Sequence, residues 1–210
     1  HTRVFITKEG NPIYEAKDLG LMSLKFKKDN FDLSIFITDN LQEEYFKVVM
    51  MAGGQINPIW KAQSVHRTHG RMSFKGQKMS SRLGGVPIAQ DIKDNFEAIA
   101  ISALKFTILK SQVGRDINFD PETSLSFEGD SGPYLLYSTV RANSILQKAG
   151  SSLHALSSKL PNDWQATNLE KLLIHFPEVT EHSIIDWAPH YIVTYLLELA
   201  QAFNSWYATT

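Results

Sequence analysis

The sequence predicts an α/β region followed by an all-α region, with the change near the middle of the chain. Two observations predict this fold class. Up to about Gly85, short β-rich runs alternate with helical ones, which is typical of βαβ units and a parallel sheet. From Ile88 onward, apolar residues recur at steps of three and four, which is typical of helices packed in a bundle.

The first β-rich run is RVFIT, at residues 3–7, and a helix is expected from about Tyr14 to Phe26. The next run, from Asp32 to Thr38, is largely apolar, which predicts a strand buried on both faces of its sheet. Strands that alternate with helices in this way pair in parallel, so a crossover helix should follow.

That second helix is expected to begin at a cap formed by Asp39 or Asn40, because short polar side chains accept bonds from free amides at a helix start. The pair Gly53-Gly54 is expected to end it. Another strand, roughly from Ala62 to Thr68, leads into a glycine-rich loop. Ligands of parallel sheets bind beyond the carboxyl ends of the strands, and this loop lies at such an end.

The second half is expected to hold a long helix through Ile88 and Phe106, then a polar segment, then a helix with Pro133 in its first turn and Gly150 at its end. Two further helices are expected at about 168–176 and 189–207. Five aromatic residues lie in apolar, periodic contexts and are expected in the core. They are Tyr134, Tyr137, Trp187, Tyr191 and Phe203.

The composition limits the classes of function that this chain can have. A chain of 210 residues with 43% hydrophobic residues can bury a core. Its formal net charge of -1 gives no general argument for a nucleic-acid partner, so such a surface must be local. The absence of cysteine excludes disulfides and thiolate chemistry, and no apolar run approaches the roughly 20 residues of a membrane span. We expect a soluble intracellular protein.

The loop FKGQKMSSRLGGVP, from Phe74 to Pro87, is the first candidate site. Between Ala62 and Gln90 there is no aspartate or glutamate, whereas lysine, arginine and glycine are frequent. Such a segment suits a bound phosphate, because its cations and backbone amides donate to anions. On charge alone a solvated basic surface loop is the better interpretation, and a phosphate site is the alternative.

Three stretches together resemble one family. KMSSR is similar to the lysine-methionine-serine-lysine signature of class I aminoacyl-tRNA synthetases. The run from Asn118 to Leu146, with Gly-Asp-Ser-Gly-Pro-Tyr at its centre, resembles the entry to the anticodon-binding helices of arginyl-tRNA synthetases. GNPIYEAKDLGL and DNLQEEYF resemble the segments that close the amino acid pocket in that family.

The resemblance implies the C-terminal half of a Rossmann-type catalytic domain joined to an α-helical anticodon-binding bundle. The implied domains are 1–93 for the catalytic part, 94–130 for a connecting helix and turn-rich segment, and 131–210 for the anticodon-binding part. The histidine-rich first signature of class I is missing from this sequence, so we expect a fragment that does not form arginyl-adenylate alone. The implied activity is arginine–tRNA ligase, in the cytoplasm.

The implied arginine-binding residues are Tyr14, Asp18 and Gln42. A guanidinium offers five donors in a planar fork, which a carboxylate accepts in pairs and a glutamine amide oxygen supplements. A separation of four places Tyr14 and Asp18 on one side of a helix. For an arbitrary pair, an exposed aspartate beside a packed tyrosine is the commoner case, and the matching segment reverses that preference.

The implied ATP-binding residues lie in and before the signature loop, with Mg²⁺ accompanying the nucleotide and no metal bound by the protein itself. Lys78, Ser80 and Ser81 are expected to act catalytically on the triphosphate. Ser81 stands where the signature has its second lysine, and either Arg82 or Lys75 can replace that charge. The complete expected set is His69, Gly70, Gly76, Lys78, Met79, Ser80, Ser81 and Arg82.

In the helical half, Tyr207 resembles a family position where an aromatic ring meets an anticodon base. Arg141 is either a phosphate contact or a solvated helix residue, and the sequence leaves both open. The implied partners are tRNA(Arg), L-arginine and ATP. Two alternatives stay open: a noncatalytic tRNA-binding or assembly module derived from a synthetase, and a different nucleotide-binding transferase, which explains the loop but not the run from Asn118 to Leu146.

Overall fold

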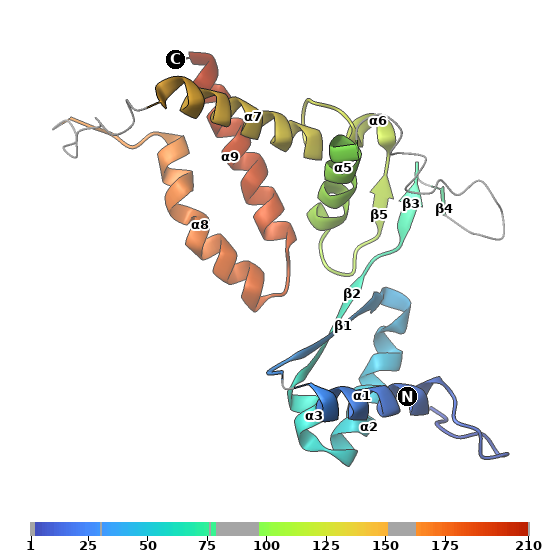
Figure 1. Cartoon of the computed structure of the whole chain (residues 1–210). Coiled ribbons are helices and arrows are strands. Elements are labelled where there is room, and N and C mark those ends of the chain that lie inside the picture. Colours follow the sequence, from blue (N-terminus) through green and yellow to red (C-terminus); the bar gives the residue numbers. More distant parts are fainter. Residues whose placement is uncertain (1–2, 30, 76, 79–96, 151–162, 210) are drawn as a thin grey trace. The chain divides into compact units, whose positions relative to one another are not determined.

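The structure is a computed structural model, and it describes residues 3–29, 31–75, 77–78, 97–150 and 163–209. The chain forms two compact units, one of residues 1–71 with 113–116, the other of 72–112 with 117–210 (Figure 1). The first unit holds α1 (Tyr14–Lys28), β1 (Ser34–Asp39), the 3₁₀ turn η1 (Asn40–Gln42), α2 (Glu43–Ile56), α3 (Pro58–Ala62) and β2 (Ser64–His69).

The second unit begins with short strands and ends in helices (Figure 1). Its elements are β3 (Met72–Phe74), β4 (Gln77–Lys78), α5 (Glu97–Lys110), β5 (Ile117–Phe119), α6 (Pro121–Ser124), α7 (Gly132–Ala149), α8 (Asn168–Ile185) and α9 (His190–Thr209). The expected α/β region followed by an all-α region is therefore confirmed. The three domains expected at 1–93, 94–130 and 131–210 are functional divisions, and they stay a prediction.

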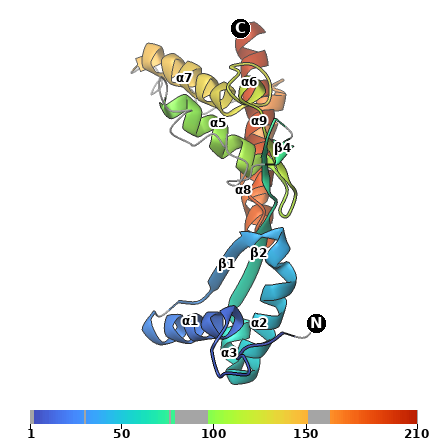
Figure 2. The same cartoon turned by 90° about the vertical axis from the view of Figure 1, so that its right-hand side faces the viewer.

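In the first unit, β1 and β2 pair in parallel, in register from Ser34 with Ser64 to Asp39 with His69. Figure 2 shows the two strands side by side. Phe46 of α2 packs on this pair, with ring centroids 5.5 Å from Phe36 of β1 and 4.5 Å from His66 of β2. One helix thus packs on both strands, as in a βαβ unit.

Three expectations for this unit are wrong in detail. Residues 3–7 form no strand, because the segment turns back on itself and makes only an isolated bridge between Ile6 and Pro12. Strand β1 is not buried on both faces: Phe36 meets α2, whereas Ile35 and Ile37 are exposed, Ile37 to 71%. Helix α2 does not stop at Gly53-Gly54 but continues to Ile56.

The glycines in α2 serve helix packing. A Cβ on Gly53 would lie 2.7 Å from the sulfur of Met22, which is a buried residue of α1. The bare backbone at Gly53 therefore lets α1 approach α2. A glycine inside a helix costs about 1 kcal/mol in propensity, and close packing of the two helices offsets that cost.

The second unit packs α5, α7 and α9 around Phe106, Val193 and Leu197. Helix α8 runs to Ile185 and not to Phe176 as expected, so Pro177 lies inside it. Pro177 has no amide to offer the Leu173 carbonyl. Next to this position α8 is held against α9, since Tyr195 donates to the Leu172 carbonyl at 3.1 Å and packs on Phe176.

The Gly-Asp-Ser-Gly-Pro-Tyr segment starts α7. Ser131 is fully buried and caps the helix, accepting from the Tyr134 amide at 3.1 Å. Pro133 lies in the first turn, as expected, and Gly150 ends the helix. A Cβ on Gly132 would lie 2.1 Å from the Ser102 carbonyl oxygen of α5, so only glycine permits this approach. Ser131, Gly132 and Pro133 therefore each have a structural reason.

In the described residues no helix is long and apolar enough to cross a membrane. The expected long helix at 88–106 is described only from Glu97, and its earlier part lies outside the described residues.

Gly132→Ala is expected to lower the free energy of unfolding by about 1–3 kcal/mol or more, because overpacking against a backbone carbonyl forces α5 and α7 apart. Gly20→Ala is the matched control. It lies inside α1 with nothing within 4 Å of an added Cβ, so it should stabilise the chain by about 1 kcal/mol. Urea unfolding followed by circular dichroism measures both, and an unchanged midpoint in Gly132→Ala would contradict the close approach.

Candidate functional site

The first cluster of interacting polar side chains lies where α1 meets α2. The Tyr45 hydroxyl of α2 donates a hydrogen bond to a carboxylate oxygen of Asp18 in α1. Glu15, one turn before Asp18, is 6% exposed, and its carboxylate lies 3.7 Å from the guanidinium of Arg3. That guanidinium also lies 5.7 Å from the centre of the Tyr45 ring. The cluster therefore joins two carboxylates, a phenol and a cation.

The electrostatics of this cluster favour a neutral tyrosine. Burial raises the pKa of Tyr45 most, the hydrogen bond to Asp18 raises it further, and the negative charges of Asp18 and Glu15 add to the effect. Tyr45 thus remains a hydrogen-bond donor at neutral pH. Because Tyr45 is the donor in this hydrogen bond, Asp18 is the acceptor, and its carboxylate can also accept hydrogen bonds from a cationic ligand.

Of the three residues expected to bind arginine, Asp18 is the one that the structure places in this cluster. Tyr14 begins α1 and is 78% exposed, with the Lys17 ammonium 5.8 Å from its ring centre. Gln42 ends η1 and is exposed. It lies one turn before Tyr45, so the two side chains lie on the same side of the helical backbone at the start of α2.

Sequence reasoning missed Tyr45, Glu15 and Arg3. A signal for Tyr45 was present, since it follows Gln42 by three residues in a segment already singled out. Nothing in the sequence pairs Arg3 with Glu15, because that contact depends on how residues 3–13 fold back.

The carboxyl ends of β1 and β2 hold the next expected residues. His69 is the last residue of β2 and pairs in register with Asp39. Its Nδ1 lies 2.8 Å from the Gly70 carbonyl. Gly70 faces the backbone of Arg115, and a Cβ there would lie 1.8 Å from the Arg115 oxygen. A close main-chain approach thus explains Gly70 without a ligand.

His66 and His69 do not form a shared metal site. Residues three apart in a strand point to opposite faces, and His66 packs on Phe46 with its Nε2 2.8 Å from the Thr38 hydroxyl. Burial lowers the pKa of His66. Within the described residues no group of three or more histidine or carboxylate side chains could hold a metal ion.

Most of the signature loop, namely Gly76, Met79, Ser80, Ser81 and Arg82, lies outside the described residues. The backbone of Lys78 is described, and it pairs with Ser73 in the antiparallel strands β3 and β4. Lys75 lies 2.7 Å from Glu122, which raises the pKa of the lysine mainly through their hydrogen bond. Both side chains are exposed, so a more highly charged anion can compete for Lys75.

In the helical half, the structure gives Arg141 partners within the chain, and the choice between a phosphate contact and a solvated residue stays open. Its guanidinium lies over two tyrosine rings, 4.6 Å from the centre of Tyr137 and 4.7 Å from that of Tyr207. It also donates to the side-chain oxygen of Asn204 in α9. Asn204 in turn donates to Ser138 at 2.8 Å. Arg141 therefore links α7 to α9.

The expected core aromatic residues behave differently from one another. Tyr134 packs against the core and Trp187 and Phe203 are partly buried. Tyr137 and Tyr191 are exposed, so the expectation that they lie in the core is wrong. Both are held by polar partners instead: Tyr137 by Arg141, and Tyr191 by Asp186, to which its hydroxyl donates at 3.1 Å.

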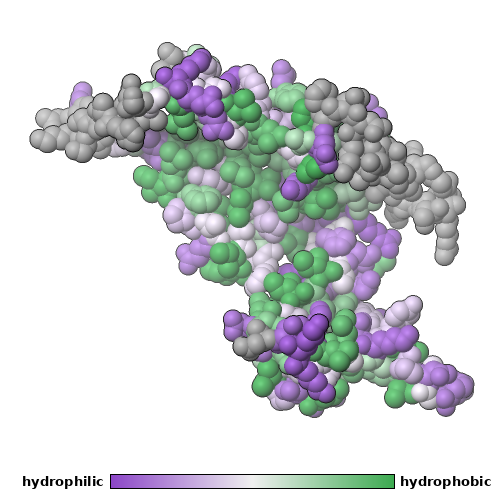
Figure 3. Space-filling model, viewed as in Figure 1, coloured by the Kyte–Doolittle hydropathy of each residue, from purple (hydrophilic) through white to green (hydrophobic). Residues whose placement is uncertain are grey.

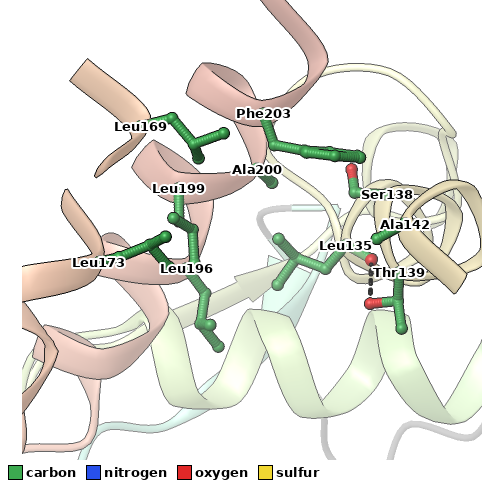
Figure 4. A pocket seen from close by; sticks show the side chains of 10 residues that line it. All are labelled: Leu135, Ser138, Thr139, Ala142, Leu169, Leu173, Leu196, Leu199, Ala200 and Phe203. Carbon is green, nitrogen blue, oxygen red and sulfur yellow. Dashed lines mark hydrogen bonds between the residues drawn. The ribbon is translucent and has the colours of Figure 1, made fainter. Parts of the chain in front are cut away.

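Two hollows lie among α7, α8 and α9. One of about 360 Å³ is apolar (Figure 4), and hydrophobic side chains gather over this part of the unit (Figure 3). Its lining residues are Leu135, Ser138, Thr139, Ala142, Leu169, Leu173, Leu196, Leu199, Ala200 and Phe203. The other, of about 780 Å³, lies mainly between α8 and α9 and contains His175, His182 and His190.

Two family models match this chain. The model of tRNA synthetases class I (R), catalytic domain, matches residues 2–120, and the model of the DALR anticodon binding domain matches residues 135–210. Among curated relatives, the arginine–tRNA ligase of Treponema denticola is 29% identical over 98% of this chain and 40% of its own length. That of Borrelia garinii is 30% identical with the same coverage. The chain thus spans about two fifths of these relatives.

Solved structures agree on the fold. The arginyl-tRNA synthetase of Thermus thermophilus superposes with a TM-score of 0.77 at 24% identity, covering 98% of this chain and 42% of that protein. The arginyl-tRNA synthetase of Plasmodium falciparum gives a TM-score of 0.71 at 20% identity, covering 98% and 39%.

The raised pKa of Tyr45 predicts an alkaline loss of stability. A phenol whose pKa is higher in the folded chain contributes fully below its unfolded pKa of about 10, and that contribution is lost as the pH rises beyond it. The urea midpoint should therefore fall above about pH 10, and Tyr45→Phe should reduce this fall. Identical pH profiles for the two proteins would show that Tyr45 is not the responsible group.

Proposed function

Because this chain belongs to the class I tRNA synthetases of the arginine type, we propose that the protein carrying it activates L-arginine with ATP and transfers it to tRNA(Arg). The observation that supports the amino acid most directly is the Asp18 carboxylate held by Tyr45, next to the buried Glu15. Such an acidic cluster between two packed helices suits a cationic side chain.

In the proposed pocket Asp18 accepts the planar fork of the guanidinium. Gln42 supplements it with an amide oxygen, and Tyr14 offers a ring face or hydroxyl. Arg3 already shows the affinity of this cluster for a guanidinium, since it lies against Glu15 and the Tyr45 ring. A ligand cation would balance the negative charge of Asp18, which among the described residues is bonded to Tyr45 and not to a cation.

In the first reaction an oxygen of the arginine carboxylate attacks the α-phosphorus of ATP. The bond from that phosphorus to the bridging oxygen breaks, and pyrophosphate leaves with the electron pair. Lys78 is proposed to stabilise the charge that develops on the leaving group, with Ser80 and Ser81 donating hydrogen bonds. His69 and Gly70, at the carboxyl end of β2, and the loop residues Gly76, Met79 and Arg82 are proposed to line the ATP site.

Mg²⁺ would be carried by the ATP phosphates, because it is commonly bound through substrate phosphates. In the second reaction a ribose hydroxyl at the end of the tRNA attacks the carbonyl carbon of arginyl-AMP, and AMP leaves. Neither step needs a protein nucleophile.

For the tRNA, we propose that Tyr207 stacks on an anticodon base and that Arg141 holds its ring in place. Tyr207 is 42% exposed, and Arg141 covers part of it. Stacking of this kind is worth about 1–3 kcal/mol per base.

The proposed domains are the catalytic part at 1–93, the connection at 94–130 and the anticodon-binding part at 131–210, in a monomeric cytoplasmic enzyme.

Asp18→Asn in the complete gene product that contains this chain should weaken arginine binding by roughly 30-fold to several thousand-fold. The variant keeps the shape but places amide donors against a donor-only ligand, and loss of one partner of a buried charge pair costs about 2–5 kcal/mol. Calorimetric titration with arginine, and separately with ATP, measures this. Unchanged arginine binding would favour the noncatalytic module, and equal losses for both ligands would make Asp18 structural.

Lys78→Ala in the same protein should lower the rate of adenylate formation while the arginine dissociation constant stays nearly unchanged. The lysine acts on charge that appears only in the transition state, so the rate is lost without ground-state binding. Pre-steady-state ATP–pyrophosphate measurements separate the two quantities. A loss confined to arginine affinity would contradict the role given to Lys78.

A further inference from the structure

We propose that Tyr45 is a positioning residue for arginine specificity, which orients the Asp18 carboxylate toward the guanidinium through the hydrogen bond between them. This inference rests on the proposed role of Asp18 in binding arginine. It adds Tyr45 to the proposed site as a residue that acts on the ligand only through Asp18.

The two residues are carried by rigid elements that pack closely. Asp18 lies in the second turn of α1 and Tyr45 in the first turn of α2. Farther along, Gly53 of α2 lies against Met22 of α1, which sets the distance between the helices. A site built on packed helices holds its geometry better than one built on loops.

The Tyr45 ring is itself fixed. The Tyr45 and Phe46 rings make a T-shaped contact, with centroids 5.2 Å apart and planes at 78°, and the Arg3 guanidinium lies over the Tyr45 ring. With the ring held by these contacts, the hydroxyl has a defined direction. It is directed to Asp18.

The neighbouring Glu15 is a possible competitor for that hydroxyl, and Arg3 removes it from competition. The Glu15 carboxylate is paired with Arg3 at 3.7 Å, while the Tyr45 hydroxyl is bonded to Asp18. Burial and the adjacent carboxylates raise the pKa of Tyr45, so the phenol keeps its proton at physiological pH and always donates.

A fixed carboxylate matters more for a guanidinium than for other cations. The two parallel N–H donors of a guanidinium require both carboxylate oxygens to lie in the plane of the guanidinium. An ammonium is a point charge and does not require this orientation. A hydroxyl that holds one oxygen of Asp18 restricts rotation of the carboxylate. Tyr45 therefore reduces the entropy that Asp18 loses when arginine binds.

The test is a double-mutant cycle with Tyr45→Phe and Asp18→Asn in the complete gene product that contains this chain. Tyr45→Phe keeps the ring, and with it the contacts to Phe46 and Arg3, but removes the hydroxyl. Tyr191→Phe is the matched control, because it removes another tyrosine hydroxyl that donates to an aspartate, Asp186, in the other unit. Calorimetric titration gives the dissociation constants for arginine and for ATP in each variant.

Tyr45→Phe alone should weaken arginine binding about tenfold, the lower end of what a hydrogen bond to a charged group contributes, with ATP binding unchanged. In the Asp18→Asn background Tyr45→Phe should have no further effect on arginine. Tyr191→Phe should leave both affinities at the parent values.

Other outcomes overturn the inference in distinguishable ways. Strong weakening by Asp18→Asn with none by Tyr45→Phe would refute the role of Tyr45 and leave the proposed function intact. No effect of Asp18→Asn would refute the proposed function first. Equal losses of arginine and ATP affinity in Tyr45→Phe, or a loss that persists in the Asp18→Asn background, would show that Tyr45 acts on the fold and not on Asp18. Urea unfolding of each variant identifies a change in stability.

Discussion

The packing of the Phe46 ring is the interaction on which the amino acid site depends. Phe46 lies against Phe36 of β1 and His66 of β2, so it fixes α2 on the parallel pair. Because α2 is fixed there, the preceding residue, Tyr45, faces α1 and reaches Asp18. A buried aromatic contact, which has no chemistry of its own, thereby sets the geometry of a half-buried polar group.

In the helical half, contacts between packed elements again fix the position of a polar group, and here the central residue is Arg141. The guanidinium of Arg141 lies over Tyr137 and Tyr207 and bonds to Asn204, so that α7 and α9 are joined by a polar contact above their apolar core. A guanidinium suits this place because it stacks on rings through its face and donates through its edge. Arg141, whose role the sequence left open, thus belongs to the framework around the Tyr207 ring.

Much of the fold follows from local pattern. The helices at Tyr14 and Gly132 and the parallel strands β1 and β2 appear where period and capping chemistry predict them. The Asp39 side chain caps the 3₁₀ turn η1 that leads into α2, and not α2 itself. The failures occur where tertiary contacts oppose local signals. Gly53 would end a helix on its own, but packing on Met22 continues α2. Pro177 would end α8, but α8 continues through it and is held against α9 there by the contacts of Tyr195 with Leu172 and Phe176.

The sequence by itself determined the division into an α/β and a helical region, the main helices, and the segments that mark the arginine-type class I synthetases. These depend on residues close together in the chain. Only the tertiary structure decided which groups meet: Asp18 with Tyr45, Arg3 with Glu15, and Arg141 with Asn204. The last of these pairs is separated by 63 positions, and no local period or cap encodes such a contact. It arises when helices pack, because burial of apolar faces fixes the distance and rotation between the helices, and these decide which polar side chains meet.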